Sequence, residues 1–468
     1  MVHPASKSST SFTNTLRRLL NGKNGPSDAV QQNIEDVVLS PAQRLIPDLV
    51  SQIFHYCVVS DKPIGKEEFP RPNTSMAPLK LARICHAWRQ VALCTPNLWA
   101  SLQIPPFWVS PVGLKEWLQR SGGCALSFSW TSSSTKAHQH RRSICSIADV
   151  LLQHASRWKH VELTVPRTCL LHLLSPLSRN RPPPLESISI TPTFASDDDF
   201  IDHLTHIFVS HLPMLSRLTL PGSNFTLSWG NDTILDNLRE LTITRPLSGA
   251  SLTLNVMLPL LQCCPRITLV DVFMNDQAFL HGNPPQLTIP LEKLSITISG
   301  SSQVTILGYL LDHLYLPALS ELTLMLDLPV VTVRGWPHLL SLLSRSQCSL
   351  LRLTVKRIPI LEEGLIECLR LIPHLQMLYL YGLRVSNVLL HSLAENAEHI
   401  LPSLTQMHVQ CGVFDQMTLC AMVRSRWENG NRKLCHIVVY ACGTGPIEDE
   451  KVKGWMAEKS LTILVLST

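Results

Sequence analysis

The feature that most restricts the fold of this chain is a short leucine-rich segment that recurs along its sequence. Copies of the pattern L-x-x-L-x-L, in which Ile or Val replaces some of the leucines, cover 185–190, 215–220, 238–243, 291–296, 319–324, 350–355, 375–380, 404–409 and 434–439. A weaker copy, Arg266–Leu269, fills the longest gap, and the interval between copies is then about 28 residues. Alternating apolar residues lie on one face of a short strand. Each copy therefore predicts one strand of a repeating unit.

The segments between these strands carry apolar residues at helical spacing. Leu361, Leu365, Leu369 and Ile372 share one face of an expected helix, and Ile201, Leu204, Ile207, Phe208 and Leu212 share another. A strand and a helix that repeat at a fixed period build a solenoid with a parallel sheet. We therefore expect an α/β fold, with an irregular leucine-rich-repeat solenoid over 158–468 and an early copy at Trp158–Val165. The alternative is chance periodicity in a leucine-rich α/β protein.

The repeat pattern also predicts individual core positions. The second apolar residue of a copy should be buried on its strand, because it points at the helices. The residues for which we expect this are Leu218, Leu294, Leu322, Leu353 and Leu378. The Asn or Cys that usually follows such a copy is mostly missing here, which predicts irregular turns.

Residues 41–101 form a separate, small helical module. A helix is expected to start over Leu45–Phe54, because Pro47 suits a first helical position and Asp48 places negative charge at the positive end of the helix dipole. A proline-rich loop over 60–75 precedes a second expected helix from Ala77 to Leu93, and Leu98 and Trp99 add two large apolar groups. So small a module has a marginal core. Some of its apolar surface should therefore be covered by a partner or by the next domain.

Three pieces of this module resemble an F-box. Leu45-Ile46-Pro47-Asp48-Leu49 with Ile53-Phe54 is similar to the F-box opening, and Leu81-Ala82-Arg83-Ile84-Cys85-His86-Ala87-Trp88-Arg89 is similar to its second half. Ala92-Leu93-Cys94-Thr95-Pro96-Asn97-Leu98-Trp99 resembles the closing segment of the F-box-like proteins of mushroom-forming fungi. Weaker likeness to the same proteins appears at 117–122, 414–415 and 422–427.

The resemblance implies a function in a cullin–RING (SCF-type) ubiquitin ligase. A chain of this family docks the Skp-type adaptor, and through it a cullin, while its other domain binds a target protein. The residues that we expect to contribute to adaptor binding are Ile46, Pro47, Leu49, Ile53, Phe54, Leu81 and Trp99. An apolar helix face laid in a groove is a common mode of protein recognition. The alternatives are a leucine-rich scaffold that has no association with the ligase, and an enzyme of unrecognised type.

The remaining segments complete the expected organisation. Residues 1–40 are expected to be a disordered, basic and polar leader. The chain has 40 Lys and Arg against 35 Asp and Glu, so its net charge is 40 − 35 = +5, and residues 1–27, which hold Lys7, Arg17, Arg18 and Lys23 and no acid, supply +4 of it. Residues 102–157 are expected to be a linker, with a helix over Leu114–Gly122, a strand over Ala125–Trp130 and a polar loop over Thr131–Ser143. A body so nearly neutral gives no indication of nucleic-acid binding.

Few side-chain groups suggest chemistry. His203, His206 and His211 lie on one expected helix, but no nearby Cys or carboxylate completes a metal site. Ser196 with Asp199 is interpreted as a helix cap, and 138–142 is expected to be a basic loop. The sequence has no catalytic motif, no C-x-x-C pair and no long apolar run. We therefore expect a non-enzymatic, intracellular protein of the cytoplasm or nucleus, with no cofactor, no metal and no membrane contact.

Overall fold

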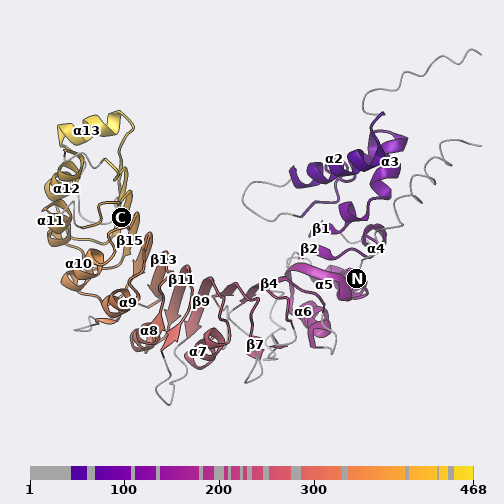
Figure 1. Cartoon of the computed structure of the whole chain (residues 1–468), viewed down its shortest axis with the longest axis horizontal. Helices are drawn as coiled ribbons and strands as arrows, with labels where there is room; N and C mark the ends of the chain where they lie inside the picture. The colour runs from indigo at the N-terminus through magenta and orange to yellow at the C-terminus, as the bar shows by residue number, and fades with distance from the viewer. Residues whose placement is uncertain are drawn as a thin grey trace, which may run out of the picture. The chain divides into compact units, whose positions relative to one another are not determined.

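The computed structural model describes residues 44–60, 69–106, 111–132, 137–178, 183–193, 205–208, 212–221, 225–228, 234–245, 252–275, 286–328, 336–395, 400–428, 432–440 and 447–466 (Figure 1). The chain divides into two compact units, Met1–Leu49 and Val50–Thr468. Of the first unit, only residues 44–49 are described, and they include the first residues of helix α2 (Pro47–Ser60). The rest of α2 and all further elements belong to the second unit.

The second unit is an α/β structure built on one long parallel sheet. Fourteen strands form this sheet: β1 (Ser101–Ile104), β2 (Leu126–Thr131), β3 (Trp158–Pro166), β4 (Ser187–Thr193), β6 (Arg217–Pro221), β8 (Glu240–Thr244), β9 (Leu269–Asn275), β11 (Lys293–Ser299), β13 (Glu321–Leu326), β14 (Arg352–Lys356), β15 (Met377–Tyr381), β16 (Gln406–Gln410), β17 (His436–Tyr440) and β18 (Thr462–Leu466). Two further two-stranded sheets pair β5 (Thr205–Phe208) with β7 (Phe225–Ser228), and β10 (Leu287–Thr288) with β12 (Leu314–Tyr315).

Helices connect many of the strands. Besides α2, the described residues contain α3 (His86–Leu93), α4 (Pro111–Arg120), α5 (Ala137–Leu152), α6 (Arg167–Leu174), α7 (Leu254–Gln262), α8 (Gln303–Asp312), α9 (His338–Ser346), α10 (Glu362–Arg370), α11 (Asn387–Glu395), α12 (Gln416–Glu428) and α13 (Glu450–Ala457), and the short 3-10 helices η2 (Leu81–Arg83), η3 (Pro96–Trp99), η5 (Ala155–Arg157) and η6 (Ser175–Ser178). In Figure 1, α8 to α11 follow one another along a single face of the sheet.

The strands of the long sheet follow one another in chain order. Each pairs in parallel with the next, and equivalent positions of successive copies lie side by side, as in Leu322↔Leu353 and Leu353↔Leu378. A parallel neighbour requires a crossover connection. Helices supply many of these connections, as α8 does between β11 and β13, whereas β7 lies between β6 and β8. All five core leucines expected from the repeat pattern are buried on strands, so those predictions are confirmed. The early copy at Trp158–Val165 is likewise a strand of this sheet, β3.

One apolar core runs through the second unit, from Val50 on α2 to Ile463 on β18. The segment 102–157 contributes β1 and β2 to the same sheet, and α4 ends at Arg120, two residues before Gly122, whose positive φ of 54° suits glycine. The helix over Leu114–Gly122 and the strand over Ala125–Trp130 are thus confirmed. The polar loop expected over Thr131–Ser143 is not, because α5 begins at Ala137.

Two helix predictions are wrong. The helix expected over Ala77–Leu93 is interrupted between η2 and α3, since Cys85 is extended (φ −154°, ψ 171°) and its Sγ accepts a hydrogen bond from the Trp88 N–H. The helix expected over Ile201–Leu212 is a strand at β5, which includes His206. His203, His211 and the Ser196–Asp199 cap lie outside the described residues. Residues 138–142 belong to α5 and not to a loop.

Candidate protein-binding surfaces

Helix α2 presents an exposed row of large apolar side chains. Ile46, Leu49, Ile53 and Tyr56, here called the α2 stripe, are 58%, 45%, 39% and 71% exposed. They follow one another at intervals of three, four and three residues. This spacing places Leu49, Ile53 and Tyr56 on one side of the helix, with Ile46 directly before its first residue. Since single apolar residues are common on surfaces but a continuous row is not, the α2 stripe is a candidate binding surface.

The neighbouring side of α2 belongs to the core of the second unit. Val50, Phe54 and Val58 are buried, and the Phe54 ring meets the Trp88 ring of α3 edge to face, with 5.1 Å between centroids. An aromatic pair of this geometry contributes about 0.5–1.5 kcal/mol beyond the area that it buries. The core contacts therefore hold α2 in place. The α2 stripe takes no part in these contacts and stays exposed.

The seven residues expected to bind an adaptor separate into two groups. Ile46, Leu49 and Ile53 are exposed, and Pro47 is half-buried. In contrast, Phe54, Leu81 and Trp99 are buried. The exposed and half-buried residues are accessible to a partner in this conformation. The three buried residues pack in the core instead. Tyr56 was missed by sequence reasoning, although its position, three residues after Ile53, was the available signal.

Trp99 shows how the buried group supports this surface. Its Nε1 donates to the Ala92 carbonyl at 2.8 Å, and its own carbonyl accepts from Trp117 Nε1 at 3.0 Å. The Trp99 and Trp117 rings meet at 4.9 Å, and the Arg120 guanidinium lies 4.7 Å from the Trp99 ring centre. Trp99 thus joins α3 to α4, and through α4 to the sheet.

A second candidate surface lies on the sheet, on the face opposite the buried leucines. Tyr379, Tyr381, His408, His436 and Tyr440, here called the aromatic face, come from β15, β16 and β17. The rings of Tyr379 and His408 meet edge to face at 4.6 Å, and those of His408 and His436 lie 5.3 Å apart. Tyr379 Oη donates to Gln406 Oε1 at 3.0 Å. Strand register brings these residues together, although register partners on neighbouring strands are about 29 or 30 positions apart in the sequence, as in Tyr381↔Gln410 and Gln410↔Tyr440.

The aromatic face changes the proton affinity of its central histidine. Burial lowers the pKa of His408 below its ordinary value, and the neighbouring His436 lowers the pKa further. Its Nε2 atom is buried without a hydrogen-bond partner among the described residues. Burial also raises the pKa of Tyr381. The neutral forms of both side chains are therefore favoured at neutral pH.

We expect His408 to make the folded chain less stable in mild acid. In the unfolded chain this histidine takes up a proton near its ordinary pKa of about 6.5, before the folded chain does. The free energy of unfolding should therefore fall as the pH drops below that value, and stop falling once the lowered pKa of His408 has been passed. Chemical denaturation of the parent and of His408→Gln between pH 7.5 and 5 measures this. A parent that loses no more stability than the variant would contradict the expectation.

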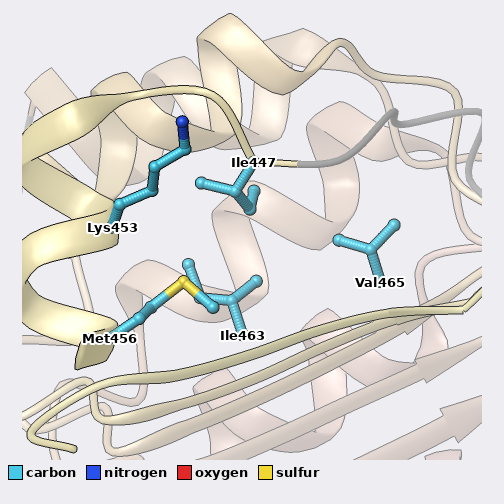
Figure 2. Close-up of a pocket in the computed structure, with 5 residues that line it drawn as sticks. All are labelled: Ile447, Lys453, Met456, Ile463 and Val465. Carbon is cyan, nitrogen blue, oxygen red and sulfur yellow. The ribbon is translucent and has the colours of Figure 1, made fainter.

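A small apolar cavity lies at the end of the sheet, between α13 and β18 (Figure 2). Its volume is about 450 Å³, and Ile447, Met456, Ile463 and Val465 line it together with Lys453. The Lys453 ammonium pairs with Glu450 at 3.0 Å. The lining therefore supplies apolar contact and one paired cation, without the several convergent polar groups that orient a ligand in a binding site.

The chemistry of the described residues is otherwise sparse. No three of their His, Cys, Asp or Glu side chains are grouped so that they could hold a metal ion. Among the helices of the described ranges, none has both the length and the apolar character needed to cross a bilayer. No family model matches the sequence, and no curated protein matches it either.

Proposed function

We propose that this chain is a substrate-receptor subunit of a cullin–RING ubiquitin ligase. In this proposal the α2 stripe docks a Skp-type adaptor, and the sheet region binds a target protein. The observation that carries the proposal is the α2 stripe itself. Three of its residues, Ile46, Leu49 and Ile53, belong to the F-box-like opening, and the stripe remains exposed although the helix packs into the core on its other side.

The spacing of the α2 stripe fits this role. A helix that lies in an apolar groove is read through side chains at intervals of three and four residues. Leu49, Ile53 and Tyr56 have these intervals, and no charged residue interrupts them on that side of α2. Asp48, His55 and Gln52 are exposed elsewhere around the helix. An adaptor groove could therefore cover the stripe without burying a charge.

The sheet region supports the second half of the proposal. Its strands follow one another in chain order, one per repeat, with helices alongside them. This order is expected of an irregular leucine-rich-repeat solenoid, which leaves one face of its sheet free for a partner. The chain would catalyse nothing itself. It would raise the effective concentration of the target near the ubiquitin-loaded enzyme.

A second candidate is a leucine-rich scaffold without ligase association. The burial of Phe54, Leu81 and Trp99 favours it, because much of the F-box-like sequence is already used in packing. In that case, the helical segment would only close the amino-terminal end of the sheet, where β1 follows η3 directly.

Complex formation with an adaptor separates the two candidates. The full chain is mixed with a purified Skp-type adaptor from a mushroom-forming fungus, and the masses are measured by size-exclusion chromatography with light scattering. A one-to-one complex is the expected result. A folded chain that elutes alone in the presence of excess adaptor would refute the ligase role and leave the scaffold.

A further inference from the structure

The charge on the open face of the sheet changes along its length. On β8 to β13 this face carries the carboxylates of Glu240, Asp271 and Glu321. From β14 to β17 its alternate positions carry no carboxylate. These positions are Arg352, Thr354, Lys356, Met377, Tyr379, Tyr381, Gln406, His408, Gln410, His436, Val438 and Tyr440.

Two cations of this region have no partner in the part of the chain that the structure describes. Lys356, the last residue of β14, makes no ion pair or hydrogen bond through its ammonium there, and neither does the guanidinium of Arg384, which is exposed just after β15. Other charges nearby are already engaged: Arg352 contacts Glu321 at 3.4 Å, and Asp327 pairs with Arg245 at 2.8 Å. Lys356 thus places an unpaired positive charge on the open face at the carboxyl end of β14, and Arg384 places another in the loop after β15.

The aromatic face lies beside Lys356. Tyr381 is the strand neighbour of Lys356, and its ring stacks along Tyr379 at 6.5 Å. Tyrosine offers a large, rigid contact area together with a hydroxyl donor, and it is enriched at protein interfaces for that reason. The chemistry on this face is thus donor-rich, aromatic and positively charged, and it is matched by a ligand that supplies acceptors and negative charge.

We propose that the open face of β14 to β17 binds an acidic, extended segment of a target protein. The inference rests on the proposed function in so far as it describes the target. Neighbouring strands lie about 4.8 Å apart, so four strands span about 15 Å, which an extended segment crosses with about four or five residues. Asp or Glu side chains would pair with Lys356 and Arg384, and the intervening residues would lie on the aromatic face.

A protein segment fits this surface better than a nucleic acid. A nucleic-acid site is expected to carry a basic stripe of many Lys and Arg residues. Here, two unpaired cations stand beside tyrosines and histidines, and the pKa of His408 is lowered, which keeps it neutral at neutral pH. Aromatic anchors with a few charges are the composition of a protein interface.

Peptide selection tests the proposal without an adaptor. Random dodecapeptides displayed on phage are selected on the immobilised full chain, and the strongest binder is synthesised for titration. We expect the selected peptides to be richer in Asp and Glu than the unselected library. Lys356→Glu, and independently Arg384→Glu, should weaken the titrated peptide at least about tenfold. Lys115→Glu on α4 makes the same change of net charge far along the sequence and should leave the affinity unchanged.

Three outcomes of this experiment would overturn the inference. Neutral or basic selected peptides would do so, as would an acidic peptide whose affinity is the same for parent and both variants while their melting curves agree. If oligo(dT) binds the parent, fails to bind Lys356→Glu and no peptide is selected, the surface is a nucleic-acid site. A chain that selects acidic peptides but fails to bind the adaptor keeps this inference and refutes the proposed function; the reverse result refutes this inference alone.

Discussion

Ile53→Asp is expected to weaken binding of the Skp-type adaptor at least a hundredfold. Ile53 is 39% exposed in the free chain and lies in the middle of the α2 stripe. Covering an aliphatic side chain contributes about 1.5–3 kcal/mol, and burying an unpaired carboxylate adds several kcal/mol of cost. Each 1.4 kcal/mol, roughly, is a factor of ten in affinity. The loss should appear in a titration of adaptor against each chain.

His55→Asp is the matched control for this variant. It lies two residues later on the same helix, is exposed, and is turned about 200° around the helix from Ile53. It introduces one carboxylate, as Ile53→Asp does. The control should bind as the parent does, and both variants should melt near the parent temperature. Equal binding by parent and Ile53→Asp, with all chains folded, would remove the functional step of the F-box interpretation.

The strands were predictable because their signal is local. The alternation in Leu319–Leu324 assigns the face of each residue without any knowledge of its neighbours, and the structure places Leu322 and Leu324 in the core. Parallel order followed from the repeat period. The aromatic face was not predictable in the same way, since Tyr379 and His408 meet only once the register of β15 and β16 is set.

Helical spacing gave less reliable results, because it shows which residues are apolar and not what covers them. Ile53 and Phe54 are adjacent in one apolar pattern, yet the first is exposed and the second is fully buried against Trp88. The break before α3 depends on one hydrogen bond to a cysteine sulfur, which no propensity scale anticipates. At β5, a pattern that also fits a helix is paired with β7 as a strand, and tertiary pairing decided the outcome.

Nothing in the sequence indicated that a charged residue would be buried. Arg426 on α12 is 1% exposed, although arginine is almost never fully buried unless it is paired. Its Nε donates to the Leu393 carbonyl at 3.2 Å, Nη1 to Leu401 at 2.9 Å and Nη2 to Ile400 at 2.7 Å. Burial lowers the pKa of this guanidinium to about 10, so it remains charged at neutral pH. One side chain thereby joins α12 to the end of α11 and to the turn before β16.

Arg426→Met should therefore lower the free energy of unfolding by about 3–5 kcal/mol. Methionine fills a similar volume but donates no hydrogen bond, so the carbonyls of Leu393 and Ile400 lose this partner, at about 1–3 kcal/mol each. The Leu401 carbonyl keeps the hydrogen bond that it accepts from the Leu404 N–H. Part of this cost is offset because the folded chain no longer buries a charge.

Arg424→Met is the matched control: it lies on the same helix, and its 3.4 Å contact with Asp449 is partly exposed, so its loss should cost under about 1 kcal/mol. Urea denaturation of the three chains gives both values. If Arg426→Met lowers the free energy of unfolding no more than Arg424→Met does, the carbonyl contacts of Arg426 do not stabilise the packing of α12 on α11. That packing would then depend on buried apolar residues such as Leu393 and Trp427.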